Sequence, residues 1–226
     1  MSKAIGACIF LIGAATVYAE DSEVTRMAAA TDVLNEMAKD KDKGIPDDLF
    51  HKAHCAVVIP SLKKAGFIFS AKYGRGFASC RQAGGGWSAP AAMRVEGGGF
   101  GLQVGGEAVD IVMLVMSDKG MKGILASKFT LGADASVAAG PVGREATAQT
   151  DATLQADILS WSRAKGVFGG LALQGGTLRV DDDGNKEIYG SKQTGTAILT
   201  GTVKPTSQTT GLLNALVQCG GNQRSR

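Results

Sequence analysis

The sequence predicts an α+β fold: a twisted antiparallel sheet or partly closed β-barrel, with helices packed outside it. Three observations lead to this prediction. More segments show the alternation of apolar and polar residues that is typical of strands than show helical periodicity. Turn-forming residues recur about every ten residues, which is typical of antiparallel sheets and barrels. Glycine makes up 32 of the 226 residues, and glycine within a sheet marks bulges, bends or close backbone approaches.

The first nineteen residues are typical of a removable signal peptide. Lys3 supplies the positive start, an apolar run follows, and Val17-Tyr18-Ala19 is a small-residue cleavage site. A lipoprotein site at Cys8 is the weaker alternative, because almost no apolar run precedes it. We therefore expect an exported protein, periplasmic or secreted, in which residues 20–226 form one domain. No long linker or low-complexity tract divides that region.

Four segments have helical signals. The first is an amphipathic N-terminal helix over Ser22–Lys39, where Met27 and Leu34 belong to the apolar stripe and Ser22 is the expected N-cap. We expect this helix to cover the sheet. The other predicted helices run from Pro46 to about His54, over Ser117–Lys128 and over Thr210–Cys219.

Most of the remaining chain reads as strands. Gly66–Tyr73 and Phe77–Arg81 are predicted to form a hairpin around Gly74-Arg75-Gly76, because glycine adopts positive φ without a Cβ clash. Asp181–Asn185 is predicted to be a turn. The further predicted strands are Ala56–Pro60, Phe100–Val104, Val109–Met116, Phe129–Ala138, Gly143–Thr150, and a hairpin of Ala156–Arg163 with Val167–Gln174.

Three cysteines remain after the predicted cleavage. Cys55 and Cys80 could pair in an oxidising compartment if their strands are neighbours, which would leave Cys219 free. The odd count and irregular spacing favour buried free thiols over this disulfide.

Catalytic and cofactor patterns are missing from the sequence. His51 and His54 have no further metal ligand near them in sequence. The glycine-rich segments lack the helix that follows a nucleotide-binding loop, and Asp181–Asn185 has its glycine in the wrong place for a calcium loop. We therefore expect no enzyme activity, no metal and no cofactor.

Charge is distributed unevenly along the chain. From Leu49 to Val95 there is no Asp or Glu, although this stretch contains seven Lys or Arg residues, while the rest of the chain has more acidic than basic residues. Basic groups beside aromatic rings suit anionic lipid headgroups in an exported protein. Nucleic acid is a weaker match for a single exported domain, so we expect none as a partner.

The predicted lipid-binding patch combines three roles. Direct phosphate contact is assigned to Lys72, Arg75 and Arg81; peripheral attraction to Lys63 and Lys64; and interfacial anchoring to Tyr73 and Trp87. The structural alternative has Lys72 and Arg81 as ordinary outward-facing strand residues and Trp87 in the core.

Six segments of the chain form a series of motifs in one order: Ala56–Gly66 (AVVIPSLKKAG), Tyr73–Gly76 (YGRG), Trp87–Pro90 (WSAP), Gly99–Gln103 (GFGLQ), Gly132–Glu145 (GADASVAAGPVGRE) and Ile158–Gly170 (ILSWSRAKGVFGG). These segments resemble the SYLF domain family, and the resemblance covers roughly Ser22 to Gly190. Trp161 stands where the family pattern has Tyr.

The resemblance implies a lipid-binding module without catalytic activity. Eukaryotic members of the family bind phosphoinositide membranes and, in fungi, actin; neither ligand is expected for an exported bacterial protein. Phosphatidylglycerol or cardiolipin are the expected substitutes, which makes the protein a peripheral membrane protein of the bacterial envelope. The competing hypothesis is an envelope protein-interaction or scaffolding module whose glycine-rich surface receives another chain, and an unrecognised hydrolase is a third.

Overall fold

The computed structural model describes residues 22–40, 44–66, 69–100, 105–126, 128–142, 155–164, 167–169 and 175–220. The predicted signal peptide and the predicted strand Gly143–Thr150 lie outside the described residues.

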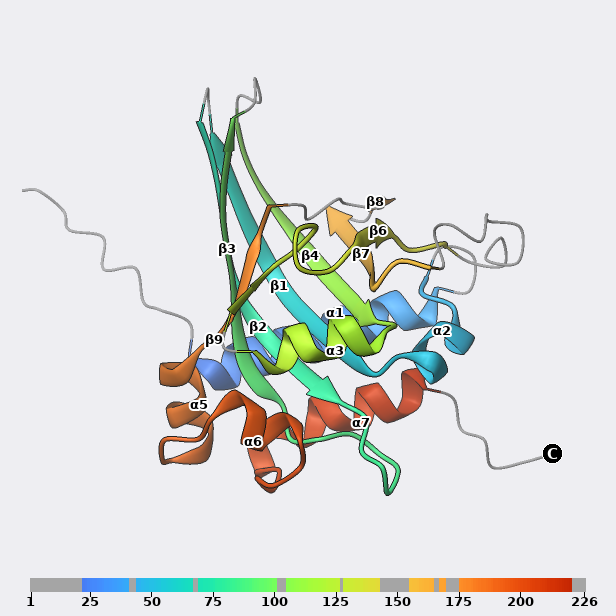
Figure 1. The fold of residues 1–226 in the computed structure, drawn as a ribbon, viewed down its shortest axis with the longest axis vertical. Coiled ribbons are helices and arrows are strands. Elements are labelled where there is room, and N and C mark those ends of the chain that lie inside the picture. Colours follow the sequence, from blue (N-terminus) through green and yellow to red (C-terminus); the bar gives the residue numbers. More distant parts are fainter. Residues whose placement is uncertain are drawn as a thin grey trace, which may run out of the picture.

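The described strands form one curled sheet (Figure 1) in the order β5-β9-β3-β2-β1-β4-β7-β6, with β8 paired to β7. Among the described strands, β6 and β7 pair in parallel and the other strand pairings are antiparallel. This confirms the predicted α+β class with a twisted antiparallel sheet. The strands are β1 (Cys55–Gly66), β2 (Phe69–Cys80), β3 (Ala91–Phe100), β4 (Gly105–Val115), β5 (Lys128–Thr130), β6 (Val137–Ala139), β7 (Ile158–Ala164), β8 (Val167–Gly169) and β9 (Thr177–Val180).

Helices cover both faces of the sheet, with α1 and α3 on opposite sides (Figure 1). None of the described helices combines the length and the apolar composition that crossing a bilayer requires. The helices are α1 (Glu23–Lys39), α2 (Asp47–Lys52), α3 (Asp118–Leu125), α5 (Asp182–Tyr189), α6 (Gly195–Leu199), the 3-10 helix η2 (Ser207–Thr209) and α7 (Thr210–Cys219).

Successive side chains of β1 point to opposite faces of the sheet and therefore belong to two separate clusters of buried residues. Val58 packs with Leu34 of α1 in one cluster of buried residues, while Val57 packs with Ile124 of α3 in the other. The predicted helices are confirmed, including their starts: Ser22 accepts a hydrogen bond from a backbone N–H of the first turn of α1, and Ser117 does the same for α3. A helix with one apolar stripe and a capping residue at its start can be predicted largely from its own local sequence.

The hairpin predicted around Gly74-Arg75-Gly76 is wrong, because β2 runs through this segment as one strand paired with β3. Both glycines lie beside an irregularity of β1, where Ser61 has a φ of 51°. A Cβ on Gly74 would lie 2.7 Å from Leu62 Cδ1, and one on Gly76 would clash with the Val58 carbonyl oxygen. The glycines therefore allow β1 to approach closely and do not form a turn.

The turn predicted at Asp181–Asn185 is the start of α5. Asp181 is the N-cap, and its carboxylate accepts the backbone N–H of Gly184 at 3.3 Å. The segment is fixed against β3, because Asn185 Oδ1 accepts the backbone N–H of Ala92 at 2.7 Å. An acidic N-cap and first turn stabilise a helix start, although the same residues are common in turns.

The single strand predicted over Phe129–Ala138 is two strands, β5 and β6. Between them lies a turn in which Gly132 has a φ of 89° and the Asp134 carboxylate accepts the backbone N–H of Thr130. A positive φ costs glycine little, so this glycine ends the strand.

Cys55 and Cys80 form a disulfide, so the preference for free thiols was wrong for this pair. The two residues stand directly opposite each other on β1 and β2. The two strands are therefore neighbours, which is the condition under which the sequence allowed this disulfide. Cys219 is free and buried, and burial raises the pKa of its thiol to about 12.

Candidate functional site

The predicted site residues of β2 point to opposite faces of the sheet, since side chains alternate along a strand. Lys72 shares its face with Ala78, which belongs to the core cluster beneath α3. Tyr73 and Arg75 share the other face with Phe77, which belongs to the cluster beneath α1. These residues therefore do not form the single patch that the sequence predicted.

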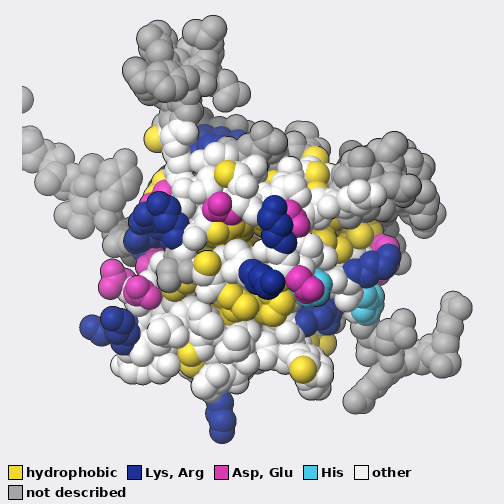
Figure 2. Space-filling view, viewed as in Figure 1, with side chains coloured by type: hydrophobic (Ala, Val, Ile, Leu, Met, Phe, Trp, Pro, Cys, Tyr) yellow, Lys and Arg dark blue, Asp and Glu magenta, His cyan; other side chains and the backbone are white. Residues whose placement is uncertain are grey.

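The lysines of β1 follow the same division. Lys63 stands opposite Tyr73 on the α1 side of the sheet, and Lys64 stands opposite Lys72 on the α3 side. Figure 2 views the α3 side and shows Lys and Arg side chains spread over this face, with Asp and Glu among them. We call Lys63, Lys64, Lys72 and Tyr73 the strand extension, because they belong to the halves of β1 and β2 that end at Gly66 and Phe69. The tips of these strands project beyond the helices (Figure 1).

The strand extension is partly open to solvent. Lys63 is exposed and the Tyr73 residue is 48% exposed. Lys64 and Lys72 are partly buried, and burial lowers the pKa of Lys72.

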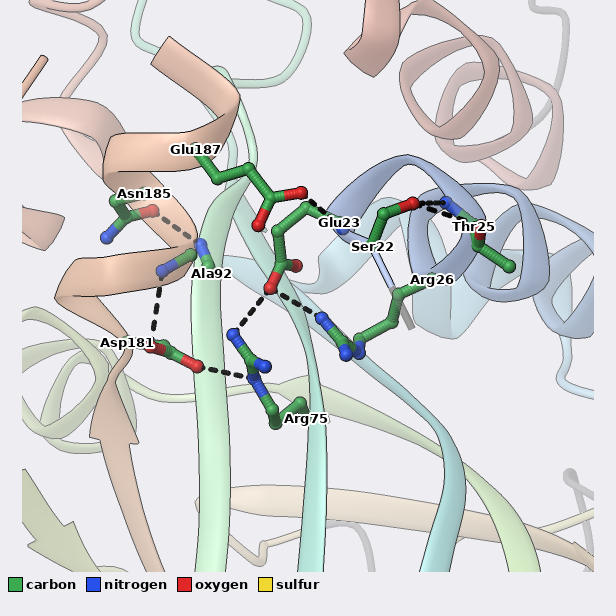
Figure 3. Close-up of polar contacts among 10 residues, drawn as sticks. Ser22, Glu23, Thr25, Arg26, Arg75, Ala92, Asp181, Asn185 and Glu187 are labelled. Carbon is green, nitrogen blue, oxygen red and sulfur yellow. Dashed lines mark hydrogen bonds and ion pairs between the residues drawn. The ribbon is translucent and has the colours of Figure 1, made fainter. Parts of the chain in front are cut away.

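Arg75 lies in an ion-pair cluster that joins three elements (Figure 3). Its Nη2 is 2.6 Å from Glu23 Oε1 at the start of α1, and its Nε is 2.7 Å from Asp181 Oδ2 before α5. Glu23 also pairs with Arg26, at 2.5 Å. We call Glu23, Arg26, Arg75 and Asp181 the Arg75 cluster.

The Arg75 cluster is buried and satisfied by its own members. The side chain of Arg75 is 13% exposed, and those of Glu23 and Asp181 are 2% and 5% exposed. Burial alone would lower the pKa of Arg75, but the charges of Glu23 and Asp181 outweigh it and raise that pKa. A headgroup that contacts Arg75 would compete with these ion pairs, so the structure favours a structural role for Arg75 over the predicted phosphate contact.

Arg81 and Trp87 lie at the other end of β2 from the strand extension. The Arg81 guanidinium carbon lies 4.5 Å from the centroid of the Trp87 ring. Arg81 Nη2 donates to the Phe50 carbonyl at 2.7 Å, and Nε donates to the Ala53 carbonyl at 3.2 Å. Arg81 thus holds the end of α2, and Trp87 packs against the core beneath α1. Trp87 is thus close to the structural alternative, in which it belongs to the core, whereas Arg81 is not the ordinary outward-facing strand residue of that alternative.

A cavity of about 460 Å³ opens beside the Arg75 cluster. It lies on the α1 side of the sheet, between the start of α1, strands β2 and β3, and α5. Apart from Arg75 and Asp181, its lining residues are Ser22, Tyr73, Arg94, Asp183 and Glu187. Within the part of the chain that the structure describes, no three His, Cys, Asp or Glu side chains are grouped as a metal site requires.

A row of four cations crosses the sheet next to this cavity. Arg75, Arg94, Arg179 and Lys128 stand opposite one another on β2, β3, β9 and β5. Like charges in register repel. Glu96 lies 3.0 Å from Arg94 and 3.8 Å from Arg179, so these two arginines share one carboxylate.

Sequence reasoning missed the acidic residues of this region. Glu23 and Asp181 pair with Arg75 across more than fifty and one hundred residues of chain, respectively, and no local pattern indicates such a partner. Asp183 and Glu187 had a usable signal: their spacing of four residues places them on one face of α5. That signal was lost when the segment was predicted to be a turn.

The family model described as "Ysc84: Las17-binding protein actin regulator" matches residues 96–219. Individual relatives extend the similarity over more of the chain. "LAS seventeen-binding protein 3" of Saccharomyces cerevisiae is 37% identical over 169 residues, which cover 73% of this chain and 36% of the relative. "SH3 domain-containing YSC84-like protein 1" of Xenopus laevis is 33% identical over 150 residues, which cover 66% of this chain and 44% of the relative.

The chain spans less than half the length of these curated relatives. Its own fold, however, includes most of the matched residues, and the matched region contains the cavity residues Asp183 and Glu187. The chain therefore belongs to the Ysc84 family, which is the SYLF domain family that its sequence motifs indicated.

Proposed function

We propose that the protein is a non-enzymatic module that binds the surface of anionic phospholipid membranes through the strand extension. The observation that carries this proposal is the placement of Lys63, Lys64, Lys72 and Tyr73 on the halves of β1 and β2 that end at Gly66 and Phe69, because the tips of these strands project beyond the helices. The exposed phenol beside Lys63 suits the boundary between headgroups and acyl chains. Each lysine near an anionic surface contributes about 1 kcal/mol of attraction.

The division of the lysines between two faces changes the expected mode of binding. A single basic face would lie flat on a membrane, whereas cations on both sides of the projecting end of the sheet, where β4 and β3 flank β1 and β2, suit an end-on approach. In that orientation Lys63 and Tyr73 meet headgroups on one side and Lys64 and Lys72 meet them on the other. Arg75, Arg81 and Trp87 take no part in this binding.

The proposed setting is the bacterial cell envelope. The sequence of the first nineteen residues supports export, and phosphatidylglycerol and cardiolipin are the proposed ligands. The protein would be periplasmic or secreted and would associate with the membrane peripherally.

Vesicle co-sedimentation tests the proposal with two matched double variants. Lys63→Gln/Lys72→Gln removes two charges from the strand extension, and Lys192→Gln/Lys204→Gln removes two exposed charges near α5 and α6. We expect the first variant to bind phosphatidylglycerol vesicles about thirtyfold more weakly than the parent protein, and the second to bind like the parent. Binding should fall as salt rises above about 0.1 M.

Equal binding to phosphatidylglycerol and phosphatidylcholine vesicles, or equal loss in both double variants, would overturn the proposal. The second candidate function would then be favoured: a protein-interaction or scaffolding role. The names of the relatives, which refer to Las17 binding and SH3 domains, support this candidate, as does the description of the family, which refers to actin regulation. Actin was not expected from the sequence, and co-sedimentation with filamentous actin in the same experiment tests it directly.

A further inference from the structure

The cavity beside the Arg75 cluster has walls of opposite charge. On the sheet side lies Arg94, with Arg179 next to it on β9. On the α5 side lie Asp183 and Glu187, which are both exposed. Arg75 and Asp181 form the floor, but they are paired within the cluster and need no further ligand.

The arginine side has hydrogen-bonding capacity left over. Among the residues that the structure describes, the Nε atoms of Arg94 and Arg179 are buried and have no hydrogen-bond partner. Arg94 Nε does lie 3.0 Å from Glu96 Oε1, yet the contact is an ion pair without hydrogen-bond geometry. Buried donors are almost always paired in native proteins. Two guanidinium groups that share one carboxylate therefore favour a further anion.

The acidic side has acceptors left over. Glu187 Oε1 accepts the backbone N–H of Glu23 at 2.8 Å, which leaves its second oxygen. Asp183 stands four residues earlier on the same helix face, and within the described part of the chain it forms no ion pair. Carboxylates at this spacing repel each other, so a cation between them would be stabilising.

We propose that this cavity binds a small zwitterion that carries a primary ammonium group and a phosphate group, such as phosphoethanolamine. The phosphate oxygens accept hydrogen bonds from Arg94 and from the Tyr73 hydroxyl, with Arg179 adding charge from the next strand. The ammonium group donates to Asp183 and Glu187. A volume of about 460 Å³ is sufficient for a molecule of this size.

Phosphate fits the arginine side better than carboxylate does. It offers three terminal oxygens and nearly two negative charges to guanidinium groups on neighbouring strands, whereas a carboxylate offers two oxygens and one charge. An ammonium group fits the opposite wall because its N–H donors match carboxylate oxygens. A quaternary amine, which has no N–H donor, should bind less well.

Titration of the protein with soluble compounds tests this assignment without any membrane. We expect phosphoethanolamine to bind about tenfold more tightly than glycerol 3-phosphate, which lacks the ammonium group, and than ethanolamine, which lacks the phosphate. Phosphocholine should be intermediate. Binding can be followed by calorimetry and by the NMR signal of the Arg94 side-chain Nε–H.

Two sets of variants assign the walls. Asp183→Asn/Glu187→Gln should remove the preference for phosphoethanolamine over glycerol 3-phosphate, and Arg94→Gln should remove the preference over ethanolamine. Asp182→Asn is the matched control, because Asp182 is an exposed acid of α5 outside the cavity. The exposed α5 variants keep the test valid if Arg94→Gln impairs folding.

The proposal is overturned if glycerol 3-phosphate binds as tightly as phosphoethanolamine, if no compound binds at millimolar concentration, or if the α5 double variant keeps the preference. Vesicles distinguish the sources of the ligand. Enhanced binding to phosphatidylethanolamine over phosphatidylcholine vesicles assigns the cavity to a lipid headgroup, and binding of the soluble compound alone assigns it to a free metabolite. Tyr73 belongs to both sites, but the binding tests leave it unchanged and use different variants, so each proposal can fail without the other.

Discussion

The two halves of the β1–β2 pair differ in the residue type that carries positive charge and in how exposed that charge is. In the half that ends at Cys55 and Cys80, each predicted site cation is committed to the protein itself: Arg75 to buried carboxylates and Arg81 to helix carbonyls. In the half that ends at Gly66 and Phe69, the strand extension carries exposed Lys63 and partly buried Lys64 and Lys72.

This contrast shows that a one-signed stretch of sequence does not define a one-signed surface. Arginine is suited to the committed half because its planar fork pairs with two partners at once, whereas lysine is a compact and strongly hydrated charge. Residue type and strand face thus distinguish cations that pair within the protein from cations proposed to contact a membrane, whereas charge alone does not.

Removing the Arg75 side chain should have the largest effect on the free energy of unfolding. Arg75→Gln should lower the free energy of unfolding by about 3–5 kcal/mol, because Glu23 and Asp181 would remain buried with less compensation. Urea unfolding measures this value. A change below about 1 kcal/mol would show that the cluster is not what holds α1 and α5 to β2.

Opening the disulfide should have the next largest effect. Cys55 and Cys80 are 25 residues apart in sequence, and closing a loop of this size stabilises a protein by about 2–4 kcal/mol. Unfolding with and without reductant measures the difference. Alkylation followed by peptide mapping should find Cys219 protected until the protein unfolds, because its thiol is buried; labelling of Cys219 in the native state would contradict this packing.

Loss of Arg81 should have an intermediate effect. Arg81→Gln removes hydrogen bonds to the Phe50 and Ala53 carbonyls and the contact with Trp87, so we expect about 1–3 kcal/mol of destabilisation. Binding to anionic vesicles should stay unchanged at a temperature where the variant is folded. The reverse pattern, full stability with weak vesicle binding, would restore Arg81 to the headgroup site.

The smallest expected effect on stability belongs to the strand extension. Lys63→Gln and Tyr73→Phe should each change the free energy of unfolding by less than about 0.5 kcal/mol, because neither side chain is buried. The same urea titrations measure them. A loss comparable with that of Arg75→Gln would remove the distinction between the two halves.

Local patterns were sufficient for the helices that carry an amphipathic stripe and a capping residue. Ser22 and Ser117 start helices as predicted, and the helix Thr210–Cys219 has the predicted bounds. The alternating segments indicated an antiparallel sheet because alternation depends only on neighbouring residues.

Features that depend on distant segments could not be predicted in this way. In the sequence Gly74 and Gly76 resemble turn glycines, because only the folded structure shows that they pack closely against β1. In the sequence Arg75 resembles a free cation, because its partners Glu23 and Asp181 are distant from it along the chain. The arginine wall of the cavity requires the pairing of β3 with β9, which the sequence did not indicate.

Quenching by spin-labelled lipids tests the central claim most directly. A fluorophore attached through Lys63→Cys reports on the strand extension, and one attached through Lys192→Cys reports on the end that carries α5 and α6. With phosphatidylglycerol vesicles, we predict strong quenching of the probe at position 63 and none at position 192. Equal quenching at both positions, or quenching at position 192 alone, would contradict binding through the strand extension.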